Sequence, residues 1–151
     1  MEAIERLTVW RCKLVREDGP AVGPSRIGGP EDVYRIVSAY LGDVDREHFV
    51  ALLLDAAHQV RGVHTVTVGV LDGSVIHPRE VFKPAILASS AAVIIAHNHP
   101  SGHPDPSAED RQVTRQLVEA GEIIGIPVLD HVIIGDGRYS SAVEGGWMGA
   151  S

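Results

Sequence analysis

The spacing of hydrophobic positions changes several times along the chain, and each spacing predicts a different element. From Pro30 onward, apolar residues recur three or four positions apart, acids fill the first turn and Gly42 follows the last, which predicts a helix between these residues. The short apolar run at 49–54 is bounded by acidic residues and is typical of a buried strand. The Val- and Thr-rich stretch at 59–71 predicts a second strand, antiparallel to the first across a turn at 56–58.

The second half of the chain continues the alternation of helices and strands. A helix is expected to start at Pro78, which suits a first turn, whereas Pro84 further along predicts a kink. Another helix is expected to start after Ser107 and to end at Gly121 or Gly125. Further strands are expected at 91–96, 126–134 and 139–142. This alternation predicts an α/β or α+β domain around one mixed sheet.

The N-terminal part of the chain has a different character from the rest. Residues 6–17 alternate partly between apolar and polar side chains and predict a strand, in which we expect Cys12 to be a packing residue. Residues 19–30 hold three prolines and four glycines, which is typical of a loop. We therefore expect a strand and a loop over 1–29, followed by one folded domain over 30–151.

The composition is that of a single soluble domain. Of its 151 residues 44% are hydrophobic, which is enough for one core, and a single cysteine excludes an internal disulfide framework or a multi-cysteine metal site. A net charge of −7 disfavours a dedicated nucleic-acid binder. No apolar run is long enough to span a membrane and the acidic N-terminus lacks a signal-peptide pattern, so we expect a cytoplasmic protein without membrane contact.

The densest polar stretch of the chain follows the strand expected at 91–96. His97 and His99 stand two residues apart at the end of that strand, so their imidazoles face the same side. A loop rich in proline then leads into a helix, and Asp110 in its first turn can return to the two imidazoles. Two nitrogens and one oxygen form a catalytic rather than a structural zinc set, because the fourth position stays open for water.

These residues match a known signature. His97-x-His99-Pro100, six residues, Ser107, two residues and Asp110 resembles the JAMM motif of the JAB/MPN metalloproteases, and the flanks resemble the RadC-like branch of that superfamily. The blocks that carry this likeness are His77-Pro-Arg-Glu-Val-Phe-Lys83, Ala96-His-Asn-His-Pro-Ser-Gly102, Pro106-Ser107 and Leu129-Asp-His-Val-Ile-Ile-Gly135. The likeness runs from about residue 30 to the end and implies a JAB/MPN-type, cytidine-deaminase-like mixed sheet flanked by helices.

The resemblance also implies roles for individual residues. One zinc ion per chain would bind His97, His99 and Asp110, and the hydroxyl of Ser107 would stabilise the oxyanion. Glu47, just before the strand at 49–54, stands where this family carries its general base. Two other acids compete for that role. Glu80 also has a structural reason to stand at a helix start, and Glu109 should point about 100° away from its neighbour Asp110 on the helix.

Several of these positions also have purely structural explanations. Ser107 and Asp110 match a capping box, in which each residue caps the other at a helix start. His103 is either a loop residue or a contact to a second metal or to substrate, and Ser101 either touches substrate or holds the loop. One residue of the pair Asp130–His131 is either a partner of a zinc-binding histidine or a satisfied buried polar group.

The function that fits these observations is that of a zinc hydrolase acting on an amide or isopeptide bond in a peptide or protein. The first alternative is a nucleic-acid-associated role in DNA repair or mobile elements, to which RadC-like proteins have long been linked. Larger RadC proteins carry a helix-hairpin-helix region, and only about thirty residues precede the domain here, which weakens that link. The second alternative is a scaffold without catalysis. Cytidine deamination is excluded because its Pro-Cys-x-x-Cys ligands are missing.

Overall fold

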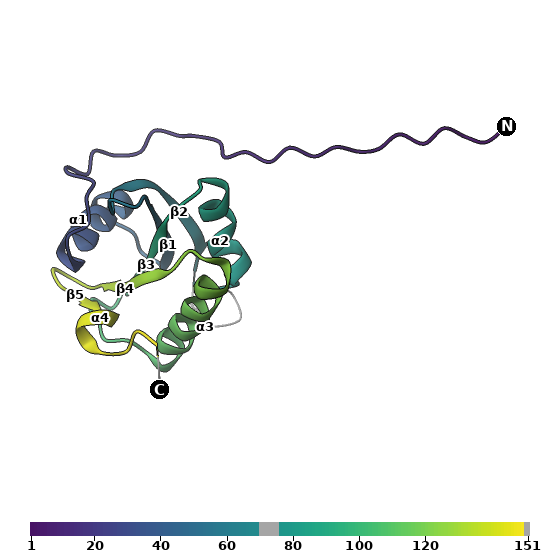
Figure 1. Cartoon of the computed structure of the whole chain (residues 1–151). Helices are drawn as coiled ribbons and strands as arrows, with labels where there is room; N and C mark the ends of the chain where they lie inside the picture. The colour runs from purple at the N-terminus through teal and green to yellow at the C-terminus, as the bar shows by residue number, and fades with distance from the viewer. Residues whose placement is uncertain (70–75, 150–151) are drawn as a thin grey trace.

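A mixed five-stranded sheet lies between two layers of helices in the computed structural model, which describes residues 1–69 and 76–149 (Figure 1). The elements in chain order are α1 (Pro30–Leu41), β1 (His48–Leu54), β2 (Val60–Val68), α2 (Pro78–Leu87), β3 (Ala92–Asn98), α3 (Ala108–Ile124), β4 (Val128–Ile134), β5 (Tyr139–Ser141) and α4 (Ala142–Gly145). The α/β fold predicted from the hydrophobic pattern is therefore confirmed.

The strands lie in the order β2-β1-β3-β4-β5, with β3 at the centre of the sheet. β3 runs antiparallel to β1 and parallel to β4, and all seven of its residues are buried. The predicted antiparallel pairing of β1 with β2 is confirmed, while the last two residues expected in the second strand, 70 and 71, lie outside the described residues. The residues that follow β3 therefore lie at the middle of one end of the sheet.

Each face of the sheet has its own core. One core packs α2 and α3 against the side chains of Phe49, Ala51, Leu53, Val93 and Ile95. The other packs α1 against the alternate residues of the same strands, including Val50, Leu52, Ile94 and Ala96. Because side chains alternate along a strand, the two continuously apolar strands β1 and β3 contribute side chains to both cores.

Local signals in the sequence fix the helix ends. α1 ends at Gly42, whose φ of 62° lies in the left-handed region that glycine tolerates. Of the two ends considered for α3, Gly125 is the correct one: its φ is 85° and its amide donates to the carbonyl of Gly121. Pro84 lies inside α2, and the helix continues for three residues beyond it.

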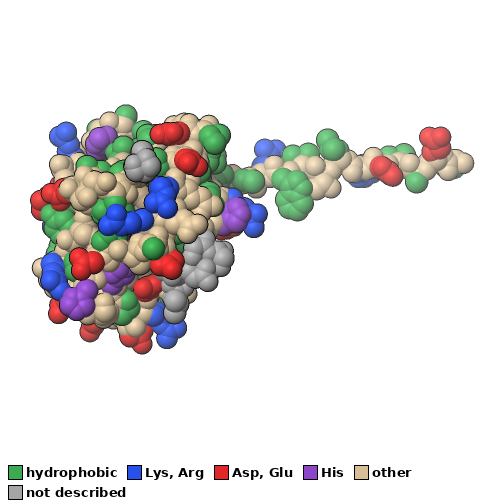
Figure 2. All heavy atoms as spheres, turned by 90° about the horizontal axis from the view of Figure 1, so that it is seen from below, with side chains coloured by type: hydrophobic (Ala, Val, Ile, Leu, Met, Phe, Trp, Pro, Cys, Tyr) green, Lys and Arg blue, Asp and Glu red, His purple; other side chains and the backbone are tan. Residues whose placement is uncertain are grey.

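The strand expected at 6–17 is wrong. This segment is extended but pairs with no neighbouring strand, and it projects away from the domain (Figures 1 and 2). Its large apolar side chains stay in solvent; Trp10 is 84% exposed. Cys12 is exposed as well, so its expected packing role is also wrong. Alternation alone does not make a strand, because the backbone groups need a ladder partner.

The chain joins the domain through the loop that was predicted before α1. Arg26 forms an isolated antiparallel bridge with Gln59 at the edge of the sheet. The guanidinium of Arg35 donates to the carbonyl oxygens of Val22 and Pro24, which ties this loop to α1. Among the helices in the described ranges, none combines the length and the apolar character needed to cross a membrane.

Candidate metal centre

Two histidine side chains at the C-terminal end of the central strand, one inside it and one directly after it, project toward the α3 face of the sheet. His97 and His99 are two residues apart in the sequence, so the pleat points both side chains to one side. The His97 side chain is fully buried and that of His99 is 15% exposed. The imidazole of His97 stacks on Phe49 of β1, with ring centroids 5.8 Å apart. The site thus stands at the border between the core and solvent.

Asp110 reaches the two imidazoles from the first turn of α3. The loop before the helix turns back at Gly102, whose φ of 87° requires glycine. Ser107 then caps the helix: its hydroxyl accepts from the amide of Asp110 at 3.0 Å, and its own amide donates to Oδ2 of Asp110 at 2.9 Å. The capping box expected from the sequence is confirmed, and it holds a carboxylate that is only 2% exposed.

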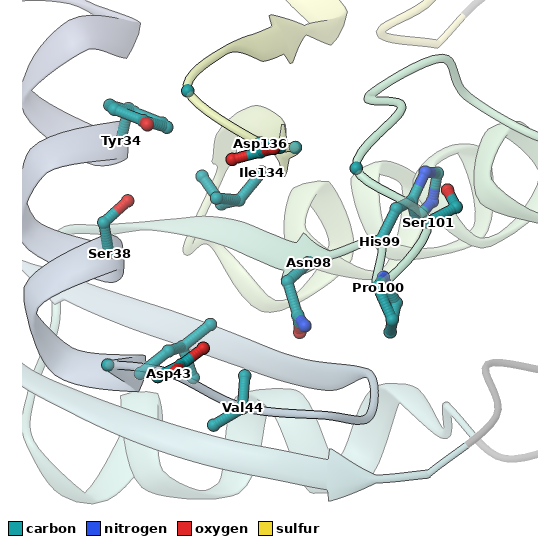
Figure 3. Close-up of a pocket in the computed structure, with 15 residues that line it drawn as sticks. Tyr34, Ser38, Asp43, Val44, Asn98, His99, Pro100, Ser101, Ile134 and Asp136 are labelled. Carbon is teal, nitrogen blue, oxygen red and sulfur yellow. The ribbon is translucent and has the colours of Figure 1, made fainter.

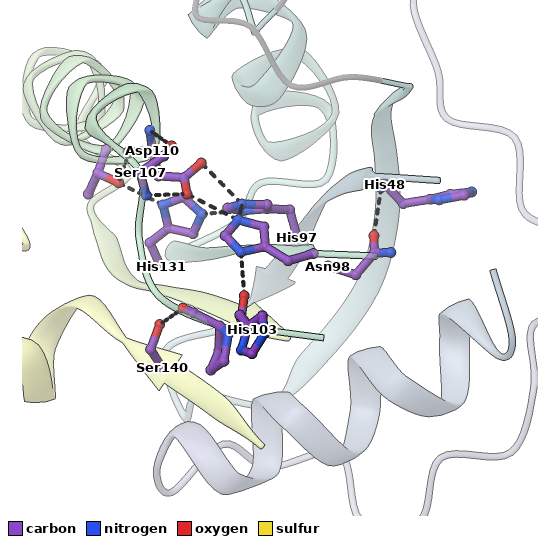
Figure 4. Close-up of polar contacts among 11 residues, drawn as sticks. His48, His97, Asn98, His103, Ser107, Asp110, His131 and Ser140 are labelled. Carbon is purple, nitrogen blue, oxygen red and sulfur yellow. Dashed lines mark hydrogen bonds and ion pairs between the residues drawn. The ribbon is translucent and has the colours of Figure 1, made fainter. Parts of the chain in front are cut away.

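The three candidate ligand atoms meet in a small triangle (Figure 4). Nε2 of His97 lies 3.1 Å from Oδ1 of Asp110, and Nε2 of His99 lies 3.1 Å from Oδ2. The two Nε2 atoms are 3.0 Å apart. A tetrahedral zinc ion at ~2.0–2.1 Å from each ligand would hold such atoms roughly 3.3 Å apart. The residues therefore fit a metal ion with small adjustments only.

The electrostatics of the triangle favour a cation. Burial alone would raise the pKa of Asp110, but the neighbouring imidazoles of His97 and His99 outweigh it and hold that pKa far below its ordinary value. The hydrogen bond to Asp110 raises the pKa of His99, against the opposing effect of burial. A buried carboxylate thus keeps its negative charge, and a proton on His99 occupies the position that a metal would take.

Zinc is expected to raise the melting temperature of the protein more at pH 8 than at pH 6. The pKa of His99 is raised, so its ion pair with Asp110 stabilises the metal-free protein fully below the unfolded value of about 6.5. That contribution is lost as the pH rises through the raised pKa, and the proton then ceases to compete with zinc. Thermal unfolding with and without zinc at both pH values measures the difference. An equal or larger effect at pH 6 would contradict this reading.

Glu47 lies beside the same triangle. β1 pairs with β3 so that Phe49 faces His97, and extending this register by two residues places Glu47 opposite His99 on the same face. The negative charge of Glu47 also contributes to the raised pKa of His99. Since Glu47 immediately precedes β1, its position follows from strand pairing rather than from sequence proximity.

Asn98 binds the peptide groups on both sides of Glu47, a role that could not be predicted from the sequence. Its side chain points to the opposite face from the two histidines, where Oδ1 accepts from the amide of His48 at 2.7 Å. Its Nδ2 donates to the carbonyl of Arg46 at 3.0 Å. An asparagine between two candidate ligands therefore anchors the segment that carries the candidate base.

The two competing acids stand in different surroundings. Glu80 accepts from Lys83 at 2.9 Å on α2, and this hydrogen bond lowers the pKa of its carboxyl group. Glu109 is exposed in the first turn of α3. The charge of Glu47 contributes to the raised pKa of His99, and neither Glu80 nor Glu109 is among the causes of that shift. This geometry favours Glu47 as the candidate base.

The two polar neighbours on β4, Asp130 and His131, contact different parts of the structure. His131 is fully buried behind the site, and its Nε2 lies 2.8 Å from Nδ1 of His97. Burial holds the pKa of His131 well below its ordinary value. Asp130 accepts from the hydroxyl of Ser141 at 2.6 Å and from the amide of Val143 at 3.1 Å, which fastens the start of α4. His131 is thus the partner of a candidate ligand.

The loop residues His103 and Ser101 support the histidine that precedes them. The backbone carbonyl of His103 accepts from Nδ1 of His99 at 2.7 Å, while its exposed ring contacts Arg138 at 2.8 Å. The hydroxyl of Ser101 accepts from the amide of His103 at 3.3 Å. These contacts agree with a loop-holding role for Ser101 and with an exposed loop position for His103. Among the described residues, the ring of His103 is not grouped with the three candidate metal ligands.

A cavity of about 380 Å³ opens beside His99 on the α1 side (Figure 3). It lies between the C-terminal half of α1 and the loops that follow β3 and β4. Its polar lining includes Ser38, Asp43, Asn98, Ser101 and Asp136, and no lysine or arginine is among the lining residues that the structure describes. His99 belongs to both the cavity and the triangle, whereas His97 and Asp110 are not among the described residues that line the cavity.

Comparisons with known proteins agree with this geometry. The family model for the RadC-like JAB domain matches residues 27–147. The chain is 57% identical over 112 residues to a UPF0758 protein of Desulforamulus reducens, covering 74% of this chain and 49% of the relative. It is 50% identical over 146 residues to a UPF0758 protein of Rubrobacter xylanophilus, covering 95% and 64%. The chain thus spans about half to two thirds of the length of these relatives.

Proposed function

Because the chain belongs to the family of RadC-like JAB domains, we propose that it is a zinc-dependent hydrolase that cleaves an amide or isopeptide bond. The observation that carries this proposal is the triangle of His97, His99 and Asp110, with the charge of Glu47 close enough to contribute to the raised pKa of His99. Two imidazole nitrogens and one carboxylate oxygen are a donor set typical of catalytic zinc, with a position left for water and substrate.

Glu47 is the proton carrier in this proposal. His97, His99 and Asp110 would hold the zinc ion, which when bound would supply a Lewis acid for the scissile carbonyl and lower the pKa of water to about 7. The carboxylate of Glu47 takes the proton from the attacking water and then gives it to the leaving amine. The pairing of β1 with β3 and the clamp from Asn98 hold this carboxylate next to His99 while both transfers occur.

Ser107 has a hydrogen-bond donor to offer although it already caps α3. Its oxygen accepts from the amide of Asp110, and this cap uses a lone pair of the hydroxyl. The hydroxyl proton remains available to donate to the oxyanion that develops on the carbonyl oxygen. Capping and oxyanion stabilisation are therefore compatible at the same time.

A peptide or protein substrate fits the charge of the domain better than a nucleic acid does. The net charge is −7, and the face seen in Figure 2 mixes acidic and basic side chains. The cavity beside His99 carries two aspartates and, among the described residues that line it, no lysine or arginine, which disfavours a phosphate backbone there. A cationic or neutral polar segment of a polypeptide is the occupant that this lining favours.

Incubating the zinc-loaded protein with a panel of peptides and isopeptide-linked conjugates tests the proposal. We expect cleavage that stops when a chelator removes the metal and resumes when zinc is restored. If no peptide or conjugate is cleaved and the protein binds DNA in a salt-dependent way, the nucleic-acid alternative is favoured instead. If none is cleaved although zinc is bound, and DNA is not bound either, a scaffold is favoured.

A further inference from the structure

A chain of three buried hydrogen bonds links two of the candidate ligands from behind. The hydroxyl of Thr114 donates to the backbone carbonyl of Asp110 at 2.7 Å. The same oxygen lies 2.6 Å from Nδ1 of His131. Nε2 of His131 lies 2.8 Å from Nδ1 of His97. Thr114, His131 and His97 are all completely buried, so no water competes for these groups.

The chemistry of the end group sets the direction of every bond in this chain. A backbone carbonyl only accepts, so the single proton of the Thr114 hydroxyl is used on Asp110. The oxygen of Thr114 must then accept from Nδ1–H of His131. A neutral imidazole carries one N–H, so Nε2 of His131 presents a lone pair and accepts from Nδ1–H of His97.

The last bond determines which nitrogen of His97 faces the triangle with a lone pair. With its proton on Nδ1, the neutral ring of His97 has an unprotonated Nε2, and this is the atom 3.1 Å from Asp110. We propose that Thr114 and His131 are positioning residues that hold His97 in its metal-binding tautomer and tie it to the turn that carries Asp110. This inference rests on the proposed metal centre and adds the means by which the centre is prepared before metal arrives.

The packing around His131 keeps the chain of hydrogen bonds in one orientation. The ring of Phe49 meets that of His131 edge-on with centroids 5.6 Å apart, and Trp147 packs on it at 5.4 Å. A flipped ring would put carbon atoms opposite Thr114 and His97 and leave buried polar groups unpaired, which is costly. His99 is oriented separately, because its Nδ1 donates to the carbonyl of His103.

Thr114→Val is the variant that breaks the chain with the least change in shape. Valine keeps the branched side chain but offers no acceptor to Nδ1–H of His131, which removes the reason for that tautomer. Zinc affinity, measured by competition with a chromophoric chelator, is expected to fall about 10- to 100-fold. Thr114→Ser restores the hydroxyl and is expected to recover most of the affinity. Ile36→Val, which trims the other core of the sheet, is the matched control and should leave zinc affinity unchanged.

Side-chain ¹⁵N–¹H correlation spectra of the metal-free wild type test the tautomers directly. We expect Nδ1–H on both His97 and His131, with a change at both rings in Thr114→Val. A proton on Nε2 of neutral His97 in the wild type would overturn the inference, as would wild-type zinc affinity in Thr114→Val. Both measurements are independent of hydrolysis: a protein that shows these tautomers and binds zinc but cleaves nothing refutes the proposed activity and leaves this inference standing.

Discussion

Glu47→Gln is expected to bind zinc like the wild type and to cleave amide substrates on the order of 100-fold to 10,000-fold more slowly. The amide of glutamine keeps the size of the side chain but neither takes a proton from water nor gives one to a leaving amine. Glu47 is not one of the three candidate metal ligands, so we expect the variant to keep its bound zinc. Steady-state cleavage rates together with zinc content per chain measure both halves of this expectation.

Glu80→Gln and Glu109→Gln are the matched controls for this experiment. Each variant makes the same chemical change at another acid that the sequence analysis considers as the general base. Glu80 is paired with Lys83 on α2 and Glu109 is exposed on α3, so we expect both variants to retain their rates. Full activity in Glu47→Gln, or a comparable loss in Glu80→Gln, would show that the base is assigned to the wrong residue.

Asp110→Asn is expected to abolish stoichiometric zinc binding while the domain stays folded. The amide oxygen of asparagine can still accept from the amide of Ser107, so the cap on α3 survives. The buried negative charge next to two imidazoles is lost, and with it the main attraction for a cation. Zinc affinity should fall on the order of 100-fold or more, beyond the loss expected for a residue that only supports a ligand.

Circular dichroism and zinc titration of this variant separate loss of the site from loss of the fold. Asp105→Asn removes one charge from an exposed position of the same loop and serves as the control. Wild-type zinc affinity in Asp110→Asn would remove this carboxylate from the metal centre. An equal loss in Asp105→Asn would show that the loop charge as a whole, rather than one ligand, attracts the ion.

The parts of the site that are close in sequence could be predicted from the sequence. His97 lies near the end of one buried strand and His99 directly follows that strand. Ser107 and Asp110 follow the rules of a helix start, so periodicity and capping place all four. Asp110 shows that a structural explanation and a functional one need not compete. The same carboxylate oxygen accepts from the amide of Ser107 and lies next to Nε2 of His99.

The parts that depend on tertiary contacts could not be predicted in the same way. Thr114 falls on the buried side of α3, where a threonine resembles any small core residue until His131 packs against it. Asn98 acts across the sheet on residues fifty positions earlier. The alternation at 6–17 was misleading for the opposite reason, because a local pattern found no ladder partner.

The metal content of the untagged wild-type protein tests the central claim most directly. Mass spectrometry is applied to the protein as purified and again after chelation followed by zinc replenishment. We predict about one zinc ion per chain in the replenished protein, held by the His97, His99 and Asp110 triangle. A wild-type protein that remains without bound metal after zinc is offered would contradict the account.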